Sequence, residues 1–107
     1  MNDTIFLEAS RKLAERMLTE GGNDPAHRID HAYELLLARP PKPSEQHLLL
    51  NALSKFETNY QKDPKAAEAF LNYGASPRNR NLPAPELAAY TSIASMILNL
   101  DAVISKE

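Results

Sequence analysis

The stretch from Pro85 to about Leu100 constrains the fold more than any other part of this chain. It reads PELAAYTSIASMILNL, and its apolar residues surround almost the whole circumference of a helix instead of forming one stripe. A helix of this kind must be covered by protein on most of its sides. It is shorter than the roughly 20 residues that span a bilayer, and polar residues such as Ser92 and Asn99 interrupt it. We therefore predict a central core helix, packed among other helices and not inserted in a membrane.

Apolar residues at helical spacing predict four earlier helices. These run from residue 2 or 3 to about 20, from 25 to about 38, from 43 to about 62, and from 64 to 73. Proline opens each helix after the first, at a position where its missing N–H costs nothing. No segment alternates at period two, so we expect no sheet. The chain should be an all-α bundle of about five helices in a single domain over residues 1–107.

The connection between the second and third helices is short and rich in proline. It extends only from Arg39 to Lys42 and contains Pro40 and Pro41. Proline excludes the helical conformation from the residue before it, so the second helix must stop here. The sequence therefore predicts a tight, stiff corner between these two helices.

The apolar stripes also predict which side chains face the core. On the third helix the inward face should consist of Leu48, Leu49, Ala52, Leu53, Phe56 and Tyr60. On the fourth helix it should consist of Ala66, Ala67, Phe70 and Leu71. The last helix should bury Leu98. It is also expected to leave an apolar strip that the other helices do not cover, made of Tyr90, Ile93 and Ile97. Because exposed apolar strips often mark interaction sites, this strip is the predicted surface for domain docking or self-association.

Charged residues follow the other face of the first helix. Three pairs of opposite charge are spaced four residues apart: Glu8–Lys12, Arg11–Glu15 and Arg16–Glu20. Each such pair stabilises a helix by about 0.2–0.5 kcal/mol. We therefore expect these side chains to lie on the solvent face and to pair along the helix.

Composition and motifs exclude several classes of function. The formal net charge of −2 gives no electrostatic reason to expect nucleic acid as a partner. The short corner could be a helix-turn-helix, but its second helix shows no basic reading face, since Lys55 is its only lysine or arginine before the last turn, and it places Glu45 where bases would be contacted. The chain has no cysteine, no nucleophile elbow and no glycine-rich phosphate loop. We therefore predict no catalytic residue and no cofactor.

Two histidines form the strongest candidate for a metal site. His27 and His31 are four residues apart and project from one helix face, as in zinc motifs of the H-E-x-x-H type. The acid beside the second histidine is Asp30, which is shorter than the usual glutamate, and no later residue is an evident third ligand. A solvated polar face is the simpler interpretation, so we expect no functional metal and keep His27 and His31 as weak candidates.

Three arginines are the candidates for an anion or interaction site. Arg39 could hold an acidic ligand, or it could cap the carbonyls that end the second helix or pair with Glu45. Arg78 and Arg80 lie in the long loop over residues 74–84, where they could bind an anion with loop N–H groups or remain solvated. If Arg78 is drawn toward Arg39 or Asp101, a built site is favoured.

Three separated stretches resemble a known family. Residues 24–45 are similar to its "DPAxRI…AF…LGRPPTPxE" segment, and Gly74 to Arg78 followed by residues 86–91 resembles "GESPR…ELAAWT". Residues 98–107 resemble its terminal "LLNLDExxTKE". This is the C-terminal part of the domain of unknown function 1553, found in large planctomycete proteins, and the resemblance covers about residues 20–107. Ala75 and Ala102 depart from it by replacing acidic residues.

The resemblance implies a piece of a long multidomain protein, generally exported and often carrying a cytochrome-c-like domain elsewhere. It brings no catalytic residues, because no activity is established for this domain. The sequence thus leaves two hypotheses. The chain is a non-catalytic helical module that packs on or recruits other domains of its parent protein, or itself. Alternatively, it is the helical part of an enzyme whose active site other domains complete, with Arg39, Arg78 and Arg80 contributing.

Overall fold

The computed structural model describes residues 3–72 and 76–105, and these residues are organised as five helices. The helices are α1 (Asp3–Glu20), α2 (Pro25–Leu37), α3 (Pro43–Lys62), α4 (Pro64–Leu71) and α5 (Ala84–Ser105). No strand occurs within the described ranges. The predicted all-α fold is therefore confirmed, and the boundaries of the first three helices agree with the predicted ones within a residue or two.

Proline sets the starts of the helices as predicted, with one difference. Pro25, Pro43 and Pro64 are the first residues of α2, α3 and α4, whereas α5 begins one residue before its proline. Asp24 and Asp63 accept hydrogen bonds from the backbone N–H groups of residues 26 and 66, which would otherwise have no partner. The first turns of α2 and α4 are therefore fixed by a proline and an aspartate together.

The last helix is longer than predicted. It has 22 residues and continues to Ser105, beyond the predicted end near Leu100. Its length therefore does not exclude a bilayer span, contrary to the prediction from the sequence. Hydropathy decides the question, because no helix in the described part of the chain is both long and apolar enough to cross a membrane.

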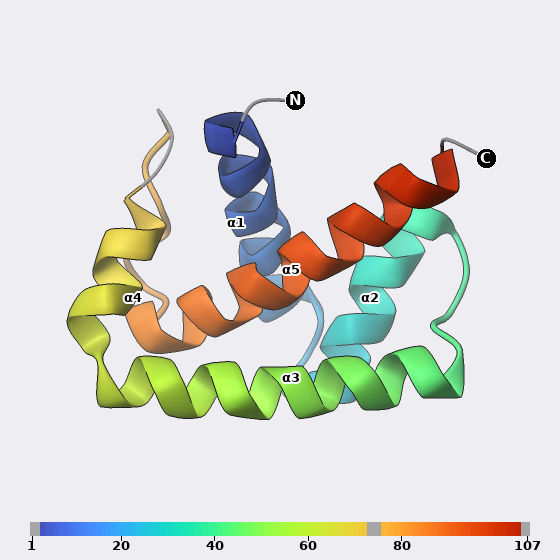
Figure 1. Cartoon of the computed structure of the whole chain (residues 1–107), viewed down its shortest axis with the longest axis horizontal. Helices are drawn as coiled ribbons and strands as arrows, with labels where there is room; N and C mark the ends of the chain where they lie inside the picture. Colours follow the sequence, from blue (N-terminus) through green and yellow to red (C-terminus); the bar gives the residue numbers. More distant parts are fainter. Residues whose placement is uncertain (1–2, 73–75, 106–107) are drawn as a thin grey trace.

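Helix α5 crosses the middle of the molecule, with the other helices around it. In Figure 1 α3 runs along one side, α4 and α2 lie toward opposite ends, and α1 passes behind α5. Each of the four other helices contacts α5. The α2–α3 corner and the loop before α5 lie toward opposite ends of the longest dimension, which measures 36 Å (Figure 1). This separation decides which candidate residues can act together.

The core is built on the first half of α5, where every residue from 87 to 94 is buried. The predicted uncovered strip is wrong, because Tyr90, Ile93 and Ile97 are all 0% exposed. Helices α1, α2, α3 and α4 together enclose this part of α5, so none of its sides remains open. The buried hydroxyl groups of Thr91 and Ser92 donate to carbonyls one turn earlier and are thereby satisfied.

Two other residues predicted to face inward lie at the surface. Leu48 is 60% exposed, and Ala66 is exposed as well. On α3 the residues that point at the core are Leu49 and Leu53. Because successive residues of a helix are about 100° apart, Leu48 must then point sideways, along the flank of α3. Leu98, predicted to be a core residue, is only partly buried.

Candidate functional site

Arg39 joins the two sides of the α2–α3 corner. Its guanidinium group donates two hydrogen bonds to the Glu45 carboxylate, at 3.1 and 3.4 Å, and one to the Pro40 carbonyl at 3.0 Å. It also lies over the ring of the buried Tyr33, 5.4 Å from the ring centroid. Glu45 accepts a further hydrogen bond from the Lys42 N–H at 2.8 Å. The pair that the sequence proposed between Arg39 and Glu45 is therefore present.

The electrostatics of the corner do not favour an acidic ligand at Arg39. Hydrogen bonding to Arg39 holds the pKa of Glu45 below its usual value, so this carboxylate stays charged opposite the arginine. A cavity of about 340 Å³ beside Arg39 is lined by two further carboxylates, Asp30 and Glu34. An anion entering this cavity would meet like charges. The corner is thus a structural joint whose cation is already neutralised.

Arg78 is held between the loop and α4. Its side chain is only 6% exposed, and it donates two hydrogen bonds to the Glu68 carboxylate, at 2.8 and 2.9 Å. Arg80 is 71% exposed and lies 3.9 Å from the same carboxylate. Arg78 therefore has a partner on α4, whereas the guanidinium group of Arg80 remains largely in solvent.

We expect Arg78→Ala to reduce the free energy of unfolding by about 2 kcal/mol, because a buried guanidinium group is lost whose Nη2 atom donates to both carboxylate oxygens of Glu68. Arg80→Ala is the matched control, since it removes a loop arginine near the same carboxylate and should cost less than about 0.5 kcal/mol. Urea denaturation followed by circular dichroism measures both. Equal, small effects for the two variants would show that the Arg78 contacts contribute nothing to stability.

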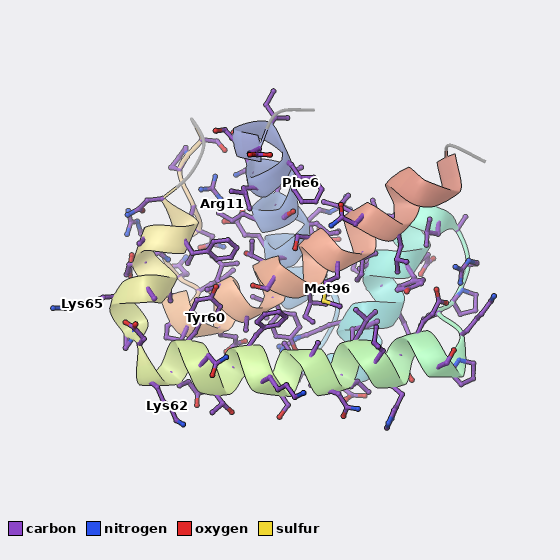
Figure 2. All side chains as sticks on the ribbon, in the orientation of Figure 1. Phe6, Arg11, Tyr60, Lys62, Lys65 and Met96 are labelled. Carbon is purple, nitrogen blue, oxygen red and sulfur yellow. The ribbon has the colours of Figure 1, made fainter. Side chains whose placement is uncertain are left out.

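Arg11 is the buried cation that the sequence did not identify. Its side chain is directed from α1 toward α4, is 3% exposed, and donates to the Leu71 carbonyl at 2.9 Å and the Ser76 carbonyl at 2.6 Å (Figure 2). The carboxylate of Glu8 accepts from the N–H and hydroxyl groups of Ser76. Glu15 accepts from the Asn79 N–H at 2.7 Å. One face of α1 therefore holds the loop before α5.

These contacts correct the predicted charge pairing on α1. Arg16–Glu20 forms as expected, with N–O distances of 3.1 and 3.2 Å. Arg11 is buried, whereas the sequence predicts it on the solvent face. Lys12 lies 3.5 Å from Glu15, which is three residues later, whereas the predicted pairs are four residues apart. Spacing could have identified Arg11, since it falls between Leu7 and Ala14 at helical intervals and thus lies within the apolar stripe.

The structure brings Arg78 and Arg80 together with Arg11 but not with Arg39. The three arginines line a polar cavity of about 230 Å³ between the end of α4 and the loop. Arg39 lies in the corner at the other end of the molecule (Figure 1). Asp101, the other residue with which Arg78 was to form a site, lies where the structure describes no side chains. Residues 74–75 of the predicted loop motif also lie outside the described residues.

A second unpredicted arginine connects α2 to α5. Arg28 donates to the Tyr90 hydroxyl at 3.1 Å and to the Gly22 carbonyl at 2.8 Å, and it lies 3.7 Å from Glu86. Its backbone approaches Gly21 so closely that a Cβ on this glycine would lie 2.9 Å from the Arg28 Cα. Burial raises the pKa of Tyr90, and the nearby Arg28 opposes this shift. Burial thus favours the neutral tyrosine, and Arg28 joins three segments through the Tyr90 hydroxyl, the Gly22 carbonyl and Glu86.

The two histidines have different neighbours. The His31 Nε2 atom lies 2.9 Å from Glu20, and the His27 Nδ1 atom lies 3.8 Å from Asp24. In the described part of the chain, no three histidine, cysteine, aspartate or glutamate residues are grouped closely enough to hold a metal ion. His31 thus connects α2 to the end of α1.

An apolar groove lies between α3 and α5 and was not predicted. It has a volume of about 540 Å³ and is lined by Leu48, Asn51, Ala52, Lys55, Phe56, Asn59 and Met96. Figure 2 shows Met96 on the side of α5 that faces α3. The groove combines an exposed leucine with three partly buried apolar side chains, and its polar residues all come from one side of α3. Leu48, which lines it, is the most exposed of the large apolar side chains among the described residues.

The N-terminal half of the chain matches a known family. The sequence model of PSD1, described as a protein of unknown function (DUF1553), matches residues 1–53. Over these residues the chain belongs to the DUF1553 family. No curated protein and no solved structure matches it. The first of the three resembling stretches, over residues 24–45, lies within the DUF1553 match, whereas the other two lie beyond it. The predicted family is therefore confirmed, and it brings no activity with it.

Proposed function

We propose that this chain is a non-catalytic helical module that packs against another domain of a larger, exported DUF1553 protein. The α3–α5 groove is its contact surface. The observation that supports this most is Leu48, which is 60% exposed at the rim of a groove whose other apolar residues are only partly covered. Exposed apolar patches rimmed by polar residues are typical of interaction sites.

The charged residues also favour a module over part of an enzyme. The carboxylates of Glu45 and Glu68 already neutralise Arg39 and Arg78, so these two arginines are not poised for an incoming substrate. Arg80 is the candidate that stays accessible, and it remains the proposed contributor if another domain completes a site. The groove offers four apolar side chains and no carboxylate. Packing is therefore the better-supported function.

A pull-down with separately expressed domains of the larger DUF1553 proteins of the same organism tests this proposal. We expect at least one domain to be retained by the wild-type chain and lost with Leu48→Asp, because a buried carboxylate opposes apolar packing. Ser54→Asp is the control, since Ser54 is exposed on α3 but does not line the groove. Circular dichroism should show both variants folded.

Three results would count against the packing module. The first is that no domain binds. The second is that Leu48→Asp and Ser54→Asp bind equally well, which would place the contact elsewhere. The third is that Arg80→Ala, but not Leu48→Asp, abolishes an activity that appears only in the complex, which would favour the enzyme alternative.

A further inference from the structure

The groove has two parallel rows of side chains on α3, and they differ in chemistry. Leu48, Ala52 and Phe56 recur every four residues and form an apolar row, which Met96 of α5 faces across the groove. Asn51, Lys55 and Asn59 recur at the same interval and form a polar row on the solvent side. Rows at this spacing are the ridges into which a second helix packs.

The length of the apolar row suits a helix. Phe56 lies eight positions after Leu48 on α3, which corresponds to about 12 Å, or about two turns of a partner helix. Two turns of an amphipathic helix present three to four apolar side chains on one face. The small side chain of Ala52, at the centre of the row, lets the partner backbone approach closely. No strand edge occurs in the described ranges, so an added strand has nothing to pair with.

Lys55 determines the charge that the partner must carry. It is the charged residue that lines the groove, it is exposed, and no carboxylate of the described residues lies within ion-pair distance of it. A partner that covers the apolar row would partly remove the Lys55 ammonium group from water. Such a group stabilises the complex only where the partner places a carboxylate opposite it.

Lys55 also disfavours a second copy of this chain as the partner that fills the groove. A two-fold axis through Ala52 would pair the Leu48 of one copy with the Phe56 of the other, which is favourable. The same axis would place Lys55 opposite residue 49 of the other copy, and the groove residues of that copy include no carboxylate, so Lys55 would be covered without an acidic partner. The groove thus selects a different helix over its own symmetry mate.

We propose that the α3–α5 groove binds an amphipathic helix of another domain, with apolar side chains on the Leu48–Phe56 row and a carboxylate opposite Lys55. This inference rests on the proposed function and adds the chemistry of the partner. The apolar row supplies the binding affinity, and Lys55 discriminates between partners by their charge.

Two labelled peptides of about 20 residues test the proposed partner chemistry. Both carry leucine at i, i+3, i+4 and i+7, and glutamate flanks this apolar face in one peptide and lysine in the other. Fluorescence anisotropy at low salt should show the glutamate peptide binding about tenfold more tightly, with the preference narrowing as salt rises. Lys55→Glu should reverse the preference. Lys65→Glu should leave it unchanged, because Lys65 lies on α4 and points away from the groove (Figure 2).

Equal affinities for the two peptides, or binding of neither, would overturn the inference. So would a concentration-dependent dimer in sedimentation that Leu48→Asp abolishes, since it would identify a second copy as the occupant. If a domain binds through Leu48 in the pull-down but the peptides show no charge preference, only this inference fails. If no domain binds at all, the proposed function fails.

Discussion

Ile93→Ala should reduce the free energy of unfolding by about 3 to 4 kcal/mol. Ile93 is 0% exposed and lies in the uninterrupted buried segment of α5, which all four other helices contact. Truncating it removes buried methyl groups and leaves a cavity that packed neighbours on several helices cannot close, and both effects destabilise the protein. Urea denaturation at neutral pH, monitored by circular dichroism, measures the change.

Leu48→Ala is the control for this prediction. It removes a similar apolar volume from α3, but at a side chain that is 60% exposed, and should cost less than about 1 kcal/mol. The sequence predicts the opposite order, since it places Leu48 in the core and Ile93 on an uncovered strip. If Leu48→Ala were the more costly variant, the packing of α3 against α5 would have to be revised.

Most of the fold could be predicted because it depends on local signals. Proline and aspartate at the helix starts act within a few residues, so Pro25, Pro43 and Pro64 located three helices correctly. The apolar circumference of the last helix correctly indicated a central position. Exposure on one face depends on where other helices lie, and spacing alone does not determine this. For that reason spacing alone places Leu48 and Ile93 in the wrong environments.

The candidate site was predictable only where its contacts are local. Arg39 and Glu45 are six residues apart across a short corner, so the sequence could propose their pairing. Arg11 contacts Leu71 and Ser76, which follow it by 60 and 65 positions in the sequence. Helical spacing favours a local pair with Glu15 instead. The groove depends on Met96 of α5 lying against residues of α3, which is again a long-range feature.

Arg11→Met should reduce the free energy of unfolding by about 3 kcal/mol. Methionine preserves most of the apolar volume of the side chain, so the variant mainly removes the donors to the Leu71 and Ser76 carbonyls. The Leu71 carbonyl belongs to the last turn of α4 and would be left buried without this charge-assisted hydrogen bond. The same loss should loosen the loop around Ser76, because Arg11 and Glu8 hold that residue together.

Arg16→Met provides the comparison on the same helix. Arg16 pairs with Glu20 but is 53% exposed, so Arg16→Met should change the free energy of unfolding by less than the error of the denaturation measurement. Hydrogen exchange locates the effect of Arg11→Met: the amides of Ser76 and Asn79 should exchange faster, while those of α5 follow the global stability. Unchanged exchange at Ser76, together with an unchanged midpoint, would mean that α1 does not hold the loop. In that case the cavity lined by Arg11, Arg78 and Arg80 would not be a fixed part of the fold.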